Sequence, residues 1–273
     1  ISDTPLSKIG GKGLFTKEID LALFDRQIDL VVHSLKDLPT EIPEGLTIGA
    51  VTKREAVQDV FVKHPRNNYT SLVSLPKSAV VATGSLRRKC QLMHLRPDFI
   101  VENLRGNVPT RIRKLDASDW DGIVLAKAGL ERLGRSDRIT EVLSTELILP
   151  AVGQGALGIE IRSDDDELSE CVARLNDAET EITTRAERVL LRHLQGGCQV
   201  PIGAYGRILN DELRLDAMIG SLDGKYVIRG TMRGNREDAE SLGARLAETL
   251  LQSGGDKILN EIRGGESIEV PYS

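Results

Sequence analysis

The chain has 273 residues, 40% of them hydrophobic and 28% charged, which indicates a globular protein of two or three domains. Its net charge of −5 argues against a nucleic-acid-binding protein with a uniformly basic surface. No apolar run reaches the ~20 residues of a membrane span, and no signal peptide is evident. Three cysteines indicate reduced thiols rather than a disulfide framework.

The chain opens on a polar, glycine-rich stretch, ISDTPLSKIGGKG, that contains Lys8 and Lys12. It resembles a phosphate-binding loop only superficially, because Leu6 and Gly13 occupy positions where that motif needs Gly and Ser or Thr. A mobile basic lid and a plain flexible loop both fit it. No strand precedes this stretch, so we expect that an N-terminal segment is missing from the chain.

A helix is predicted over residues 14–26, where apolar residues recur at helical spacing, and a strand over Ile28–Val32. The apolar run of that strand, without alternation, predicts a parallel strand covered on both faces. His33, Ser34, Lys36 and Asp37 follow at once, closed by Pro39.

Two interpretations of the Lys36–Asp37 pair remain open at this point. It is either a surface turn or a pair facing a ligand, because ligands of open α/β sheets bind outside the carboxyl ends of strands. In a cleft lined with cations, Asp37 would stay ionised and could stabilise a positive charge developing on a substrate.

Residues 72–150 alternate between strand-like and helix-like segments, which predicts an open α/β sheet. In TGSLRRKCQ, Ser85 is a predicted N-cap that leaves Arg87 and Arg88 in the first helical turn. The helix dipole disfavours cations there by ~0.3–1 kcal/mol each. The pair is either solvated or placed to bind an anion at the helix N-terminus.

A second strand end carries the same chemistry. In NLRGNVPTRIRK, Arg105 precedes Gly106 and Arg111 follows within the next turns, and Arg132 is a third candidate. Arginines at two strand ends of one α/β domain predict a ligand with several carboxylates, held by guanidinium groups.

Residues 149–162 form a glycine-punctuated crossing and a strand that we expect to return to the first domain. After about residue 178 the pattern changes to a helix over 179–194, an antiparallel hairpin turning at Asp223-Gly224, and an amphipathic helix closing on Gly254. We therefore predict an α/β fold with a smaller C-terminal α+β domain. The expected boundaries are 1–55 with 153–175, 56–152, and 176–273.

Cys198 lies between Gly197 and Pro201 in a predicted turn, where an accessible thiol can act as a nucleophile if cations lower its pKa. Cys90 and Cys171 fall in helical patterns and are predicted core residues. A Cys–His hydrolase built on Cys198 and His193 lacks the other motifs of such enzymes. The histidines show no metal-ligand spacing, so we predict no metal site.

Six segments resemble those of the porphobilinogen deaminase (hydroxymethylbilane synthase) family in order and approximate spacing. They are GGKGLFTKE, VVHSLKDLP, GSLRRKCQL, LRGNVPTR, LPAVGQGALGIE and GGCQVPIGAY. The resemblance implies two periplasmic-binding-protein-like domains plus the smaller C-terminal domain. It also implies the head-to-tail condensation of four porphobilinogen molecules into 1-hydroxymethylbilane, with release of ammonia.

The resemblance further implies a dipyrromethane cofactor bound by a thioether to Cys198, and a catalytic role for Asp37. The residues it assigns to cofactor binding are Cys198, Lys36, Ser34, Ser85, Arg87, Arg88 and Gly106. Those it assigns to substrate binding are Arg105, Arg111, Arg132, Lys8, Lys12, Phe15, Gln154 and Arg54. Porphobilinogen carries an acetate and a propionate, so the family chemistry agrees with the predicted arginine sites. Loss of ammonia leaves a cation that a lone carboxylate can stabilise.

The alternative is a non-catalytic anion-binding protein of the periplasmic-binding type, which would use the same arginines but would need neither Cys198 nor Asp37. For the enzyme we expect a cytoplasmic monomer, with a plastid location also compatible. Its expected partner is the small-molecule substrate, without nucleic acid or membrane.

Overall fold

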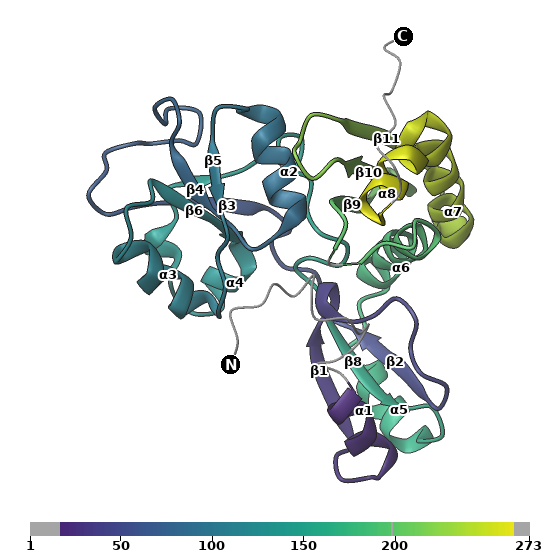
Figure 1. Cartoon of the computed structure of the whole chain (residues 1–273). Helices are drawn as coiled ribbons and strands as arrows, with labels where there is room; N and C mark the ends of the chain where they lie inside the picture. The colour runs from purple at the N-terminus through teal and green to yellow at the C-terminus, as the bar shows by residue number, and fades with distance from the viewer. Residues whose placement is uncertain (1–16, 198, 265–273) are drawn as a thin grey trace.

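Three β-sheets, each with its own helices, make up the part of the chain that the computed structural model describes, residues 17–197 and 199–264. The three units lie around the segments that connect them (Figure 1). Among these residues no helix combines the length and apolar composition that a bilayer crossing requires.

The first unit is a three-stranded antiparallel sheet in the order β1-β8-β2, with helices α1 and α5 beside it. Its elements are α1 (Lys17–Phe24), β1 (Leu30–Ser34), β2 (Leu46–Val51), β8 (Leu157–Arg162) and α5 (Asp166–Ala173). Strand β8 comes from the far side of the second unit in sequence, so the expected return of the chain is confirmed.

The prediction of a parallel strand covered on both faces is wrong for β1. The strand begins at Leu30, pairs antiparallel with β8, and exposes Leu30 and Val32 to solvent. An apolar run predicts that a strand forms, but not which strand pairs with it or in which direction. The partner of β1 is β8, which lies more than a hundred positions away in the sequence.

The second unit is a five-stranded mixed sheet in the order β5-β4-β6-β3-β7. Strand β4 pairs parallel with β5 and β6, and β3 pairs antiparallel with β6 and β7. Its elements are β3 (Asp59–Lys63), β4 (Val80–Ala82), α2 (Leu86–Leu95), β5 (Ile100–Glu102), α3 (Val108–Asp116), β6 (Gly122–Ala126), α4 (Lys127–Glu131) and β7 (Glu141–Val142). Two apolar clusters fill this unit. The alternation of strands and helices from β4 to α4 confirms the predicted α/β pattern.

The third unit packs α6 and α7 on an antiparallel sheet in the order β11-β10-β9. Its elements are α6 (Ala178–His193), β9 (Ile202–Leu209), β10 (Glu212–Gly220), β11 (Val227–Asn235), α7 (Ala239–Leu250) and α8 (Asp256–Ile262). The predicted helix, the hairpin turning at Asp223-Gly224 and the C-terminal helix are confirmed, as is the smaller α+β unit.

Two connecting segments run side by side between the first and second units. Glu55 donates its backbone N–H to the Gly155 carbonyl at 3.0 Å, and Gly155 has a φ of +91°. A Cβ at Gly155 would lie 2.6 Å from the carbonyl oxygen of Glu55, so only glycine allows this close approach.

The two described cysteines differ in environment. Cys90 is fully buried, as predicted, and burial raises the pKa of its thiol to about 12, with Asp223 acting in the same direction. Cys171 is exposed on α5, so its predicted place in the core is wrong. Only one stripe of that short helix is apolar, and Val172 rather than Cys171 lies on it.

Candidate active site

The 3-10 turn η2 (Leu35–Asp37) presents Lys36 and Asp37 at the end of β1. Leu35 and Leu38 on either side are buried against Val51 and Ala156. Because these two leucines point into the core, Lys36 and Asp37 are left exposed between them. The turn is also held by the Leu35 N–H, which donates to the Ala156 carbonyl at 3.0 Å.

Arg87 and Arg88, in the first turn of α2, both form ion pairs with Asp59 at the start of β3. The Arg87 Nη2–Asp59 Oδ2 distance is 2.9 Å and the Arg88 Nη2–Asp59 Oδ1 distance is 2.7 Å. All three side chains are buried. Burial alone would raise the pKa of Asp59, but the two guanidinium charges hold it well below its usual range.

This arrangement answers part of the question raised by two cations at a helix N-terminus. An internal carboxylate, not only solvent or a bound anion, compensates their charge, and sequence reasoning missed Asp59. The predicted N-cap is confirmed, because Ser85 Oγ accepts the backbone N–H of Arg88 at 3.4 Å. The ligand-binding roles of Arg87 and Arg88 stay a prediction.

Gln154, in the second connecting segment, is buried in the same network. Its Nε2 donates to Asp59 Oδ1 at 2.8 Å and to the Val57 carbonyl at 2.7 Å. Arg87 donates in addition to the carbonyl oxygen of Leu149. The predicted Gln154 therefore lies beside the predicted arginines, in contact with the carboxylate that they share.

The Lys36–Asp37 pair of the first unit lies within electrostatic range of the arginines of the second. The pKa of Lys36 is lowered by desolvation among protein atoms and by the charge of Arg88, while Asp37 opposes the shift. Lys36 keeps solvent access, which screens these charges more than a closed core would. The pKa of Arg111 is lowered by burial and by Arg88, and Asp37 acts against the shift.

The second strand end carries Arg105 and Gly106 ahead of α3. Gly106 has a φ of +115°, and its carbonyl accepts Nε of Arg111 at 2.7 Å. Asn107 caps the helix by accepting the Thr110 N–H. Arg105 is half-buried. This turn therefore brings two predicted arginines together beside the site.

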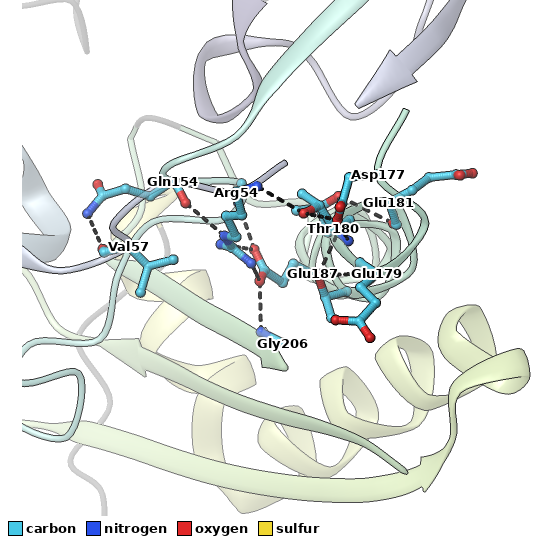
Figure 2. Close-up of polar contacts among 12 residues, drawn as sticks. Arg54, Val57, Gln154, Asp177, Glu179, Thr180, Glu181, Glu187 and Gly206 are labelled. Atoms are coloured by element: carbon cyan, nitrogen blue, oxygen red, sulfur yellow. Dashed lines mark hydrogen bonds and ion pairs between the residues drawn. The ribbon is translucent and has the colours of Figure 1, made fainter. Parts of the chain in front are cut away.

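Arg132 and Arg54 have carboxylate partners within the chain. Arg132 Nε lies 2.9 Å from Glu55 Oε2 in an exposed pair. Arg54 is mostly buried, and both its terminal nitrogens bond Glu187 on α6, at 2.6 and 3.1 Å. Figure 2 shows Arg54 and Glu187 pointing toward one another, with Gln154 beside them.

Glu187 is the centre of a junction between the units, and sequence reasoning missed it. Its Oε2 also accepts the Gly153 N–H at 2.7 Å. Its Oε1 accepts the Gly206 N–H, also at 2.7 Å (Figure 2). With the guanidinium of Arg54 held in this buried pair, its substrate-binding role stays a prediction without a contact to support it.

Ser34 is half-buried at the end of β1, and its side chain makes no capping hydrogen bond to η2. Four predicted residues, Lys8, Lys12, Phe15 and Cys198, lie outside the described residues. Within 17–197 and 199–264, no group of three or more His, Cys, Asp or Glu is arranged to hold a metal ion.

Asp37 and the cations around it belong to a chain of several α/β units, and comparison with known families shows which family that chain belongs to. The model of the dipyromethane cofactor-binding domain of porphobilinogen deaminase matches residues 1–170, and that of its C-terminal domain matches residues 181–252. The chain belongs to the porphobilinogen deaminase family. Its function is hydroxymethylbilane synthesis from porphobilinogen, with a dipyrromethane cofactor.

Solved structures similar to the chain include three bacterial binding proteins. An arginine-specific periplasmic binding protein of Salmonella typhimurium is 16% identical, with 59% of this chain and 70% of that chain covered and a TM-score of 0.35. A substrate-binding domain of a putative amino acid transporter from Streptococcus pneumoniae is 11% identical, with 58% and 69% covered and a TM-score of 0.39. A probable amino-acid transporter binding protein from Bacillus subtilis is 10% identical, with 58% and 68% covered and a TM-score of 0.35.

Proposed function

We propose that Asp37 is the catalytic group of a transferase that condenses four porphobilinogen molecules, and that the surrounding cations hold the carboxylates of the growing chain. The observation that carries this proposal is the electrostatic contact between units. The charge of Arg88 on the second unit acts on Lys36 of the first unit, and the charge of Asp37 on the first unit acts on Arg111 of the second.

The chemistry asked of Asp37 is suited to its position. Exposed as the last residue of η2, it can approach the carbon from which ammonia leaves and stabilise the positive charge that develops there. The same carboxylate can share a proton with the leaving amine. The attacking atom is a pyrrole carbon of the substrate chain, so elongation needs no side-chain nucleophile.

The surplus of positive charge fits a polycarboxylate ligand. Within residues 17–197 and 199–264, the carboxylates that interact with Lys36, Arg87, Arg88 and Arg111 are those of Asp37 and Asp59. Lys36 and Arg111 reach solvent and would contact the ligand's acetate and propionate groups directly. Arg105 and Arg132 would extend the same surface. Arg87 and Arg88 are buried against Asp59. They would hydrogen-bond the ligand only through the N–H groups that Asp59 leaves available.

The dipyrromethane group fits this donor set because it presents several carboxylates of its own. Lys36, Ser34, Ser85, Arg87, Arg88 and Gly106 would hold it, and Cys198 would carry the thioether. When bound, it supplies the free pyrrole carbon to which the first substrate is joined. We also propose that the three sheets correspond to three domains, 1–55 with 153–175, 56–152, and 176–273. A monomeric state and a cytoplasmic location stay predictions.

The intact mass of the purified protein tests this proposal. Protein expressed with the tetrapyrrole precursor available should be heavier than its sequence by two linked pyrrole units. Cys198→Ser should remove the excess mass, and the matched control Cys171→Ser should keep it. A mass equal to the sequence, or an excess retained in Cys198→Ser, would refute the proposed anchor. A non-catalytic anion-binding protein would bind porphobilinogen without releasing ammonia.

A further inference from the structure

Arg188 of helix α6 holds the backbone immediately after Asp37. Its Nη2 donates to the Pro39 carbonyl at 2.6 Å, and its Nη1 donates to the Leu38 carbonyl at 3.3 Å. These carbonyls lie beyond the last residue of η2, in a segment that belongs to no helix or strand. The contact therefore joins the third unit to the segment that presents the proposed catalytic carboxylate.

Packing alone leaves this segment open on one side. Leu35 and Leu38 are buried. A groove of about 320 Å³ nevertheless separates η2 and strand β2, on one side, from helix α6 on the other. Leu35, Thr40 and Arg188 are among its lining residues. On this open side the charge-assisted hydrogen bonds of Arg188 restrain the backbone where apolar contacts do not.

Arg188 remains an effective donor in this setting. Burial and the charge of Arg192 lower its pKa to about 10, while Glu160 acts in the opposite direction. The guanidinium is thus charged at neutral pH. Glu160 is itself bonded to His33 at 2.9 Å. The hydrogen bonds of Arg188 within the described residues go to main-chain oxygens rather than to a carboxylate.

The position of Arg188 along its helix links two parts of the proposed mechanism. Helix α6 ends at His193 and leads through Gly196 and Gly197 directly to Cys198 in the sequence. Glu187, the neighbouring residue, fixes the same helix to Arg54 and to the connecting segment at Gly153. One helix therefore contacts the Asp37 segment on one side and precedes the proposed cofactor cysteine at its end.

We propose that Arg188 is a positioning residue, which fixes Asp37 relative to the helix that leads to the cofactor cysteine by tying the Leu38 and Pro39 carbonyls to α6. This inference rests on the roles proposed above for Asp37 and Cys198. Among the described residues, the hydrogen bonds of Arg188 go to the Leu38 and Pro39 carbonyls and not to the Asp37 carboxylate. Loss of Arg188 should leave the Asp37 side chain in place but free to move away from the reacting carbon, which lowers turnover more than binding.

Three variants test the proposal. Arg188→Met keeps much of the side-chain volume and removes both donors. Arg188→Lys keeps the charge and can bond one carbonyl at a time. Arg185→Met removes a cation from the same helix and groove, at an exposed position for which the described residues show no hydrogen bond or ion pair. It is the matched control for net charge.

In Arg188→Met we expect kcat to fall by at least ~10-fold. KM should stay within a factor of about 2, and the intact mass should show full cofactor loading. Arg188→Lys should recover part of the lost kcat, and Arg185→Met should match the wild type. A kcat of Arg188→Met within 2-fold of wild type at full loading would overturn the proposal. So would an Arg188→Lys variant no better than Arg188→Met. If Arg188→Met does not fold, the comparison of Arg188→Lys with Arg185→Met decides, and equal kcat values there would overturn the proposal.

Amide hydrogen exchange tests the tether without reference to activity. Peptides covering 35–40 should exchange at least ~10-fold faster in Arg188→Met than in Arg185→Met, while peptides from β10 stay unchanged. Unchanged exchange at 35–40 would overturn the tether even if the enzyme is active. Faster exchange in a protein whose wild type makes no hydroxymethylbilane would instead refute the proposed function and leave the tether standing.

Discussion

Replacing Asp59 with Asn should destabilise the five-stranded unit strongly, because it leaves two buried guanidinium groups without their shared counter-ion. Asp59 is fully buried, and the side chains of Arg87 and Arg88 are 4% and 6% exposed. Removing one partner of a buried ion pair costs about 3–5 kcal/mol. That cost is a large part of the about 5–15 kcal/mol that stabilises a typical domain.

The single tryptophan of the chain gives a local assay for this effect. Trp120 packs against the cluster that contains Val60 and Ile123, in the same sheet as Asp59. Urea unfolding followed by its fluorescence therefore reports the five-stranded unit. Asp116→Asn, which removes one partner of a partly exposed ion pair with Arg138, is the matched control, and its cost should stay below about 1 kcal/mol.

The effect should also depend on pH in a defined direction. The folded-state pKa of Asp59 lies below its usual value, so the unfolded chain takes up the proton first as the pH falls. The stabilisation is therefore fully present above the ordinary carboxyl pKa and is lost as the pH falls toward the folded one. We expect a constant difference between wild type and Asp59→Asn from pH 8 to 5, which shrinks below about pH 4. A difference under about 1 kcal/mol at pH 7, or one that grows on acidification, would refute the reasoning.

Asp37→Asn should retain the fold and the cofactor mass while turnover collapses, since the amide cannot carry the charge that opposes the developing cation; near-normal ammonia release would contradict the assigned role. Arg105→Ala should make the reaction stall at partial chain lengths, because it removes a charge-assisted contact worth about 1.5–3 kcal/mol, and an unchanged distribution of intermediates by mass spectrometry would count against it. Iodoacetamide at pH 8 should label exposed Cys171 but not Cys90, whose buried thiol has a pKa of about 12. Glu187→Gln should lower the thermal midpoint by several degrees, because it weakens the buried pair with Arg54, and an unchanged midpoint would exclude that pair as a stabilising contact.

The order of elements followed from local sequence. Helical spacing located α6, the Asp223-Gly224 dipeptide located the β10–β11 turn, and Ser85 marked the start of α2. The motifs that carry the family resemblance are also local, and that resemblance implied the class of chemistry. The arginines at two strand ends independently indicated a ligand with several carboxylates. These features depend on neighbours within a few residues, which is the range over which capping, turn preference and periodicity act.

Tertiary structure decided which charges meet. Asp59 is 28 positions before Arg87 and gives no spacing signal, yet it neutralises part of the predicted anion site. Glu187 and Arg188 look like ordinary polar residues of an amphipathic helix, and only folding brings them to Arg54 and to the Leu38–Pro39 carbonyls. The direction of β1 likewise depended on β8. Such long-range partners are set by the packing of whole units, because an ion pair or a strand neighbour is chosen by three-dimensional proximity and burial and not by separation along the chain.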